Sequence, residues 1–196
     1  MKRLFNRLPL IVGIVLVLVT LFTSMIAGCK SGTGPVVLTV INGNETKTFT
    51  VAQLEKLPSI SGTTGDISST GTIEGPFLYK GVPLTDILKA VGGLTPDEAV
   101  TISAKDGYSM TMSYNQVEKG TEFPTFDTVT GKEVTPAPTI TVFMAYEKDG
   151  TMLDNTVGPL RLGIMSPNQL TDGHWWVKWA LKIQVISVPQ STSTSN

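Results

Sequence analysis

Apolar and polar side chains alternate along much of the chain between residues 36 and 188, and this period of two predicts a protein built mainly of strands. The clearest alternation runs over residues 177–185, where the residues between the apolar ones are two lysines, an alanine and a glutamine. We expect this segment to be a closing strand with one face in the core and the lysines on the other face. Further strands are predicted at residues 36–41, 47–50, 100–104, 108–112, 139–146 and 160–164.

Turn residues join several of these strands directly to their neighbours. Asn42-Gly43 and Asp106-Gly107 each separate two strand-like runs, which is typical of a β-hairpin. Strands and helices do not alternate regularly, so a doubly wound parallel sheet is not expected. The sequence therefore predicts an α+β fold, with a mostly antiparallel or mixed β sheet or barrel and short helices.

Helix signals are few and short. Residues 84–91 are the clearest predicted helix, with apolar residues on one face, Thr85 as a candidate N-cap and Gly92-Gly93 at its end. Thr50 and Gln53 fit a capping box that opens a second short helix. Less regular segments are a helical turn at 115–118, a stretch at 59–75 that is either loop or irregular strand, and a long excursion at 121–138.

The first 28 residues have the pattern of an export signal. A basic start is followed by the strongly apolar residues 8–25, and Ile26-Ala27-Gly28 supplies small residues before Cys29. This ending resembles a bacterial lipobox, which implies cleavage before Cys29 and a lipid on its thiol. The alternative is an uncleaved transmembrane anchor, because the apolar run is about as long as a span requires. Both interpretations place the globular part on the extracytoplasmic face of a cell membrane.

The rest of the chain divides into a tether at residues 29–35, one globular domain at 36–188 and a disordered Ser/Thr tail at 189–196. The whole chain has a net charge of −1. Residues 1–28 hold three of its 15 basic residues and no acidic one, so 12 basic residues face 16 acidic ones in the remainder. This excess of negative charge argues against a nucleic-acid partner.

Rare side chains are concentrated in residues 158–185, which hold all three tryptophans, the only histidine and the only arginine beyond residue 7. We expect Arg161, His174 and Lys178 to converge beside Trp175 and to hold a small anionic ligand, because a guanidinium suits carboxylate and phosphate. The alternative for Arg161 is a surface ion pair. Motifs for zinc binding, serine hydrolysis, P-loops and dinucleotides are absent from the sequence.

Four segments resemble the sulfite oxidase-type oxidoreductase molybdopterin-binding domain, in the same order and over residues 36–188. They are Tyr79 to Leu88 around Gly81-Val82-Pro83-Leu84, Asp106-Gly107-Tyr108, Gly158-Pro159-Leu160-Arg161 and Val177-Lys178-Trp179. The resemblance implies that family's fold and a pterin ligand, such as molybdopterin or a related pterin phosphate. It also adds Tyr79, Asp106 and Tyr108 to the expected ligand pocket.

The departures from that family concern its chemistry. A family cysteine that holds molybdenum lies upstream of the Gly-Val-Pro-Leu segment, but the matching residues 60–75 contain no cysteine. A hydroxyl is a poor replacement for the soft thiolate, so molybdenum is not expected here. Trp175 and Trp176 stand where the family commonly has residues that grip the pterin phosphate.

The favoured hypothesis is a membrane-anchored extracytoplasmic lipoprotein, attached through Cys29, whose domain is a non-catalytic binding or accessory module for a small anion or pterin-type ligand. The first alternative is a genuine molybdopterin-dependent oxidoreductase with a metal site that lacks cysteine. The second is a surface domain that presents the aromatic cluster of residues 175–179 to a protein partner.

Overall fold

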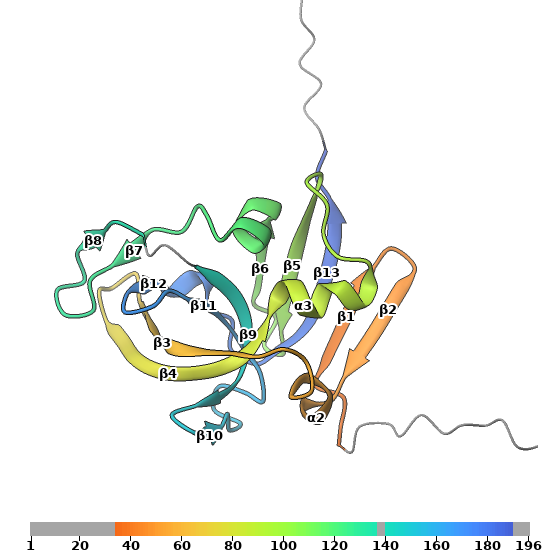
Figure 1. Ribbon diagram of the computed structural model, residues 1–196, viewed down its shortest axis with the longest axis horizontal. Helices are drawn as coiled ribbons and strands as arrows, with labels where there is room; N and C mark the ends of the chain where they lie inside the picture. The colour runs from red at the N-terminus through yellow and green to blue at the C-terminus, as the bar shows by residue number, and fades with distance from the viewer. Residues whose placement is uncertain (1–33, 137–139, 190–196) are drawn as a thin grey trace, which may run out of the picture. The chain divides into compact units, whose positions relative to one another are not determined.

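Strands dominate residues 34–136 and 140–189, which are the residues that the computed structural model describes (Figure 1). They form one sheet of five strands and one of eight. The strand order of the first is β2 (Glu45–Phe49), β1 (Leu38–Asn42), β13 (Ala180–Ser187), β5 (Glu98–Ala104) and β6 (Ser109–Ser113). The order of the second is β10 (Thr151–Met152), β9 (Thr141–Lys148), β4 (Ile73–Pro83), β3 (Ile60–Ile67), β12 (Leu170–Asp172), β7 (Thr125–Phe126) and β8 (Glu133–Val134), with β11 (Arg161–Met165) paired to β9.

Most strand pairs are antiparallel, as the hairpin signals predict. The pairs β1–β13 and β3–β12 are parallel, so both sheets are mixed. Neither strand order closes on itself within the described residues. Of the two arrangements expected from the sequence, the structure therefore has open sheets and no closed barrel. The α+β class expected from the sequence is confirmed.

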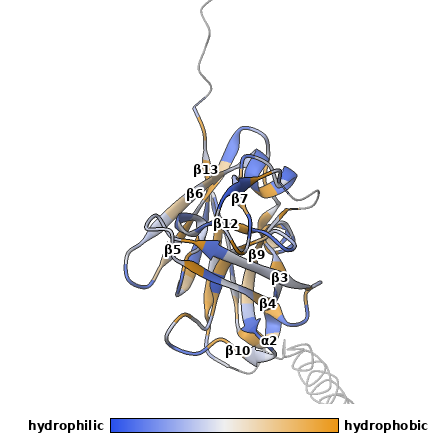
Figure 2. Cartoon of the chain, turned by 90° about the vertical axis from the view of Figure 1, so that its left-hand side faces the viewer, coloured by the Kyte–Doolittle hydropathy of each residue, from blue (hydrophilic) through white to orange (hydrophobic). Residues whose placement is uncertain are grey.

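The core lies where both sheets and one short helix meet. The helix α3 (Leu84–Leu88) continues into the 3-10 turn η1 (Lys89–Val91) and buries Leu84, Ile87 and Leu88 completely. These side chains belong to one apolar cluster with residues of both sheets, and Figure 1 shows α3 between the two groups of strands. Hydrophobic and hydrophilic stretches are mixed along the strands (Figure 2), and β11 is buried along its whole length.

Local turn chemistry accounts for the elements that the sequence predicts well. The hairpins at Asn42-Gly43 and Asp106-Gly107 form as β1–β2 and β5–β6. Thr50 caps the helix α2 (Val51–Leu54) in a complete capping box with Gln53. The turn expected at 115–118 is the π-helical turn η2 (Asn115–Lys119).

Thr85 does not cap the 84–91 helix. The N-cap is Pro83, which makes no side-chain hydrogen bond there, so the fixed backbone of proline starts the helix. Residues 59–75, for which the sequence did not decide between loop and strand, supply the strand β3 and the beginning of β4. The sequence does not reveal these strands, because the many Gly, Ser and Thr residues of this stretch do not give the apolar–polar alternation that marks a strand.

The closing strand begins later than the alternation predicts, at Ala180. Trp179 has a positive φ of 52°, and the pairing with β5 shifts register between Ala180 and Lys182. The side chains before and after this irregularity therefore do not share one face. Leu181 is 41% exposed although the alternation assigns it to the core.

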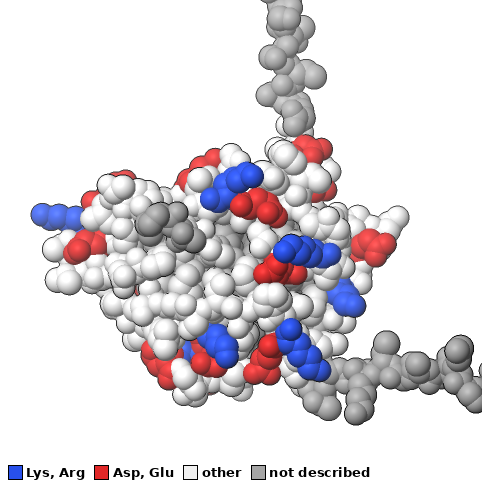
Figure 3. Space-filling view, viewed as in Figure 1, with Lys and Arg blue, Asp and Glu red and all other residues white. Residues whose placement is uncertain are grey.

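Acidic and basic side chains are interspersed on the face shown in Figure 3, without a large patch of one sign. Among residues 34–136 and 140–189, no helix has the length and apolar character needed to cross a membrane. The apolar segment 8–25, Cys29 and the tail 190–196 lie outside the described residues.

Candidate functional site

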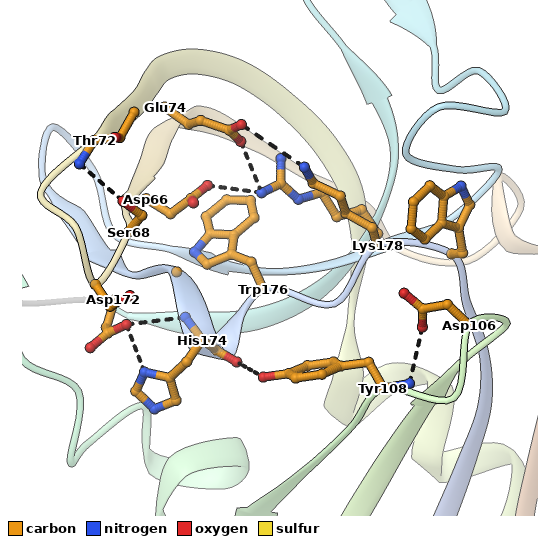
Figure 4. A pocket seen from close by; sticks show the side chains of 14 residues that line it. Asp66, Ser68, Thr72, Glu74, Asp106, Tyr108, Asp172, His174, Trp176 and Lys178 are labelled. Atoms are coloured by element: carbon orange, nitrogen blue, oxygen red, sulfur yellow. Dashed lines mark hydrogen bonds and ion pairs between the residues drawn. The ribbon is translucent and has the colours of Figure 1, made fainter.

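A cavity of about 450 Å³ brings together residues from four separate parts of the chain (Figure 4). Strands β3 and β4 and the turn between them form one wall, and the β5–β6 turn and β11 supply others. The fourth part is the segment that begins at the end of β12 and includes the 3-10 turn η3 (Gly173–Trp175). The lining residues are Asp66, Ser68, Ser69, Thr72, Glu74, Asp106, Tyr108, Arg161, Asp172, Gly173, His174, Trp176, Lys178 and Trp179.

Arg161 is the centre of a buried polar network at this cavity. It lies on β11 and is only 4% exposed. Its Nη2 donates to Asp66 Oδ1 at 2.9 Å and to Glu74 Oε2 at 3.4 Å, and its Nη1 donates to the Tyr79 hydroxyl at 3.1 Å. The surface ion pair considered for Arg161 is thus wrong, because the guanidinium is inside the protein.

The guanidinium also stacks on an aromatic ring. Its Cζ lies 4.6 Å from the centroid of the Trp176 ring, a distance at which a cation is attracted to the aromatic face. Trp176 is 5% exposed and donates from Nε1 to the Thr171 hydroxyl at 2.9 Å. Arg161 Nε is buried and has no hydrogen-bond partner among the described residues.

Burial governs the protonation of the groups around Arg161. It raises the pKa of the Asp66 carboxyl above its ordinary value, and the positive charge of Arg161 only partly offsets this effect. It also raises the pKa of the Tyr79 hydroxyl, with Arg161 again acting in the opposite direction. These directions show that the network is held in a poorly solvated place, where each charge depends on its partner.

Asp172 and His174 form a second polar group at the start of η3. Asp172 Oδ1 accepts from the His174 backbone at 3.1 Å and lies 2.7 Å from His174 Nδ1. Partial burial raises the pKa of Asp172, but these contacts with the backbone and ring of His174 outweigh it and leave the pKa lowered. The carboxyl is therefore an anion at neutral pH.

Tyr108 links this group to the β5–β6 turn. Its hydroxyl donates to the carbonyl oxygen of His174 at 2.7 Å, and its backbone N–H donates to Asp106 Oδ1 at 3.0 Å. Partial burial, and then the negative charge of Asp172, raise the pKa of the Tyr108 hydroxyl. The contact fixes the position of the β5–β6 turn relative to η3.

The structure brings most of the predicted site residues to this one cavity. Arg161, His174, Lys178, Asp106 and Tyr108 line it, and Tyr79 contacts Arg161. Trp175 does not line it: its ring packs edge-on against Phe123, with centroids 5.5 Å apart, and against the His174 ring at 4.2 Å. Trp176 and Trp179 line the cavity instead, and the turn η3 lies just before Trp176.

Three of the four carboxylates at the cavity were not predicted from the sequence. Asp66 and Glu74 lie in a stretch without clear periodicity, and Asp172 gave no signal beyond its place in a turn-rich loop. With these residues included, four carboxylates and two basic side chains, Arg161 and Lys178, line the cavity. Lys178 Nζ lies 3.9 Å from Glu74 Oε1, so both basic groups already have acidic neighbours.

Comparison with solved structures supports the expected fold. The crystal structure of the sulfane dehydrogenase SoxCD from Paracoccus pantotrophus matches with a TM-score of 0.52 and 17% sequence identity, over 81% of this chain and 40% of that chain. The chain thus spans well under half of the protein that it resembles. The likeness supports a distant relation to the sulfite oxidase-type molybdopterin fold and, at this identity, shows the fold alone. No protein-family model and no curated protein matches the sequence.

The donor groups at the cavity do not fit a molybdenum cofactor. The described residues contain no cysteine, which is the residue that holds molybdenum in the family that the sequence resembles. A pterin phosphate needs positive charge that is free to bind it, whereas Arg161 is already bonded to Asp66 and Glu74. The likeness in fold therefore does not extend to the groups that would hold this cofactor.

We expect Arg161→Met to lower the free energy of unfolding by about 3–5 kcal/mol, because it leaves the buried Asp66 carboxylate without its partner. The matched variant Lys178→Met breaks only a long, partly exposed contact and is expected to cost at most about 1 kcal/mol. The penalty of Arg161→Met should shrink as the pH falls toward 3.8, the ordinary aspartate value. Arg161 lowers the pKa of Asp66, so without it the already raised folded-state pKa rises further and the carboxyl is protonated at a higher pH in the variant than in the wild type.

Urea unfolding of both full-length variants, at neutral pH and at mildly acidic pH, measures these differences. Equal costs for Arg161→Met and Lys178→Met at neutral pH would show that the buried pair does not stabilise the fold.

Proposed function

We propose that this chain is an extracytoplasmic lipoprotein whose domain binds a small organic ligand and performs no molybdenum-dependent redox chemistry. The observation that supports the absence of molybdenum chemistry is the environment of Arg161. This residue is 4% exposed, bonded to Asp66 and Glu74, and stacked on Trp176. A guanidinium in this position organises the wall of a cavity. It does not offer free positive charge to an anionic cofactor.

The cavity itself supports ligand binding. Its volume of about 450 Å³ falls in the range of pockets for small molecules, and it combines aromatic side chains with a few charged and hydroxyl groups. A small anion, which the sequence analysis favoured, fits less well, because four carboxylates line the cavity. The ligand class is therefore the part of the original hypothesis that we revise.

A protein partner at residues 175–179 is less favoured than a small ligand. Trp176 is buried, and Trp175 is packed against Phe123 and His174, so much of the tryptophan surface is already covered within the chain. Interface hot spots require aromatic side chains that a partner can reach.

The proposal for the membrane anchor rests on the sequence of residues 26–29, Ile-Ala-Gly-Cys, which lie outside the described residues. A lipidated Cys29 would retain the domain at the membrane, because two or three acyl chains give stable attachment whereas one chain is marginal. The tether of residues 30–35 then separates the domain from the lipid surface.

Metal and pterin content test the absence of a redox cofactor. In protein purified from a host that synthesises molybdopterin, we expect substoichiometric molybdenum by mass spectrometry and no pterin fluorescence after acid oxidation. One molybdenum per chain, with activity that depends on it, would establish the oxidoreductase alternative suggested by the sulfane dehydrogenase fold.

Cys29→Ser tests the anchor. We expect this change to abolish incorporation of labelled fatty acid and to leave an unprocessed precursor, because the thiol is the atom that carries the lipid. Ser31→Ala, two residues along the tether, is the control and should be processed normally. Wild-type protein that keeps Met1 and is recovered from the cytoplasm would contradict the proposed localisation.

A further inference from the structure

Two of the four carboxylates at the cavity lack a lysine or arginine partner. Asp66 and Glu74 are paired with Arg161, and Glu74 also with Lys178. In the described part of the chain, Asp172 is paired only with His174, and Asp106 with no basic side chain. Figure 4 shows both on the side of the cavity away from Glu74, so neither faces a lysine or arginine there.

An aromatic surface lies between these two carboxylates. Tyr108 is 42% exposed, and its ring lies between Asp106 and the Asp172–His174 pair in Figure 4. The ring is fixed at both ends, by the hydroxyl bond to the His174 carbonyl and by the backbone bond to Asp106. Aromatic rings together with carboxylates are the surroundings in which proteins recognise organic ammonium groups.

Of the two tryptophan rings at the cavity, one already contacts a cation of the protein and the other is available to a ligand. The guanidinium of Arg161 already lies against the Trp176 ring, at 4.6 Å from its centroid. Trp179 also lines the cavity, and its indole Nε1 is tied to the Asn155 carbonyl at 2.9 Å. Tyr108 and Trp179 are thus the aromatic side chains that can still receive a cation.

A metal cation is not the occupant that these groups favour. Within residues 34–136 and 140–189, no three His, Cys, Asp or Glu side chains are grouped closely enough to hold a metal ion. Asp106 and Asp172 are separated by an aromatic ring, which a metal ion cannot use as a ligand. A polyatomic cation can lie against the ring, where the negative charges of both carboxylates attract it.

Arg161 gives an independent indication that the cavity is completed by a bound molecule. It is 4% exposed and lines the cavity, yet its Nε has no hydrogen-bond acceptor among the described residues. A buried donor without a partner is rare in native proteins and requires an acceptor such as a bound water or ligand hydroxyl.

From this geometry we infer that the cavity binds a small organic ammonium compound, with its positive nitrogen over Tyr108 and between Asp106 and Asp172. The inference rests on the proposed function, because it specifies the ligand of the same cavity. It reverses the charge of the ligand class expected from the sequence.

Choline is the probe for this site, and 3,3-dimethyl-1-butanol is its matched control, because it has the same shape and hydroxyl group but no charge. Titration calorimetry of the full-length protein in detergent, at constant ionic strength, compares these two compounds with inorganic phosphate. We expect choline to bind about tenfold or more tightly than its neutral counterpart, since a tenfold difference corresponds to the strength of a partly desolvated cation–π contact. Phosphate should not bind.

Three variants locate the binding. Asp106→Asn and Asp172→Asn keep the oxygen that accepts from the Tyr108 and His174 backbones but remove the charge, and each should weaken choline about fivefold, as for a partly exposed ion pair. Glu45→Gln, on the exposed strand β2, removes the same charge away from the cavity and should leave choline binding unchanged. Thermal unfolding of each variant confirms that the fold is retained.

Equal affinity for choline and its neutral counterpart, preferential phosphate binding, or full choline affinity in both Asn variants would each overturn the ammonium site. Molybdenum analysis of the same preparation distinguishes failure of the ammonium site from failure of the proposed function. Molybdenum-free protein that does not bind choline contradicts only the ligand class. One molybdenum per chain contradicts the proposed function itself.

Discussion

The buried ion pair between Arg161 and Asp66 is the constraint on which the site depends. A guanidinium that is 4% exposed loses most of its hydration, so it needs acceptors with good geometry inside the protein. Asp66, Glu74 and Tyr79 supply them from β3 and β4, and the Trp176 ring covers one face. The same contacts hold β11 and the segment after η3 against the β3–β4 wall. One charge network therefore shapes the cavity and neutralises the positive charge of Arg161.

This arrangement shows why the fold, which is similar to that of a sulfane dehydrogenase, does not by itself identify what the cavity binds. A fold places strand ends and turns at a given position, but the side chains at that position decide what binds there. Here the groups at the cavity are carboxylates, hydroxyls and aromatic rings, with no thiolate among the described residues. The charge of the cavity is set by the side chains that this sequence places there.

Sequence reasoning succeeded where short segments determine the outcome. The Asn42-Gly43 and Asp106-Gly107 turns and the Thr50 capping box act within a few residues, and all three form. It failed where contacts are distant: Asp66 and Arg161 are 95 residues apart, so nothing local indicates their pairing. The exchange of Trp175 for Trp176 has a different, local cause: the turn η3 ends at Trp175, and nothing in the sequence indicated this turn.

The central claim is that Arg161 belongs to the wall of the cavity and is not free to bind an anion. A crystal structure of the protein grown with an excess of sodium phosphate tests it most directly, because it shows the guanidinium and any bound anion together. The account predicts that Arg161 Nη2 remains bonded to Asp66 and that no phosphate lies in the cavity. Phosphate bound to the guanidinium, with Asp66 turned away, would contradict it.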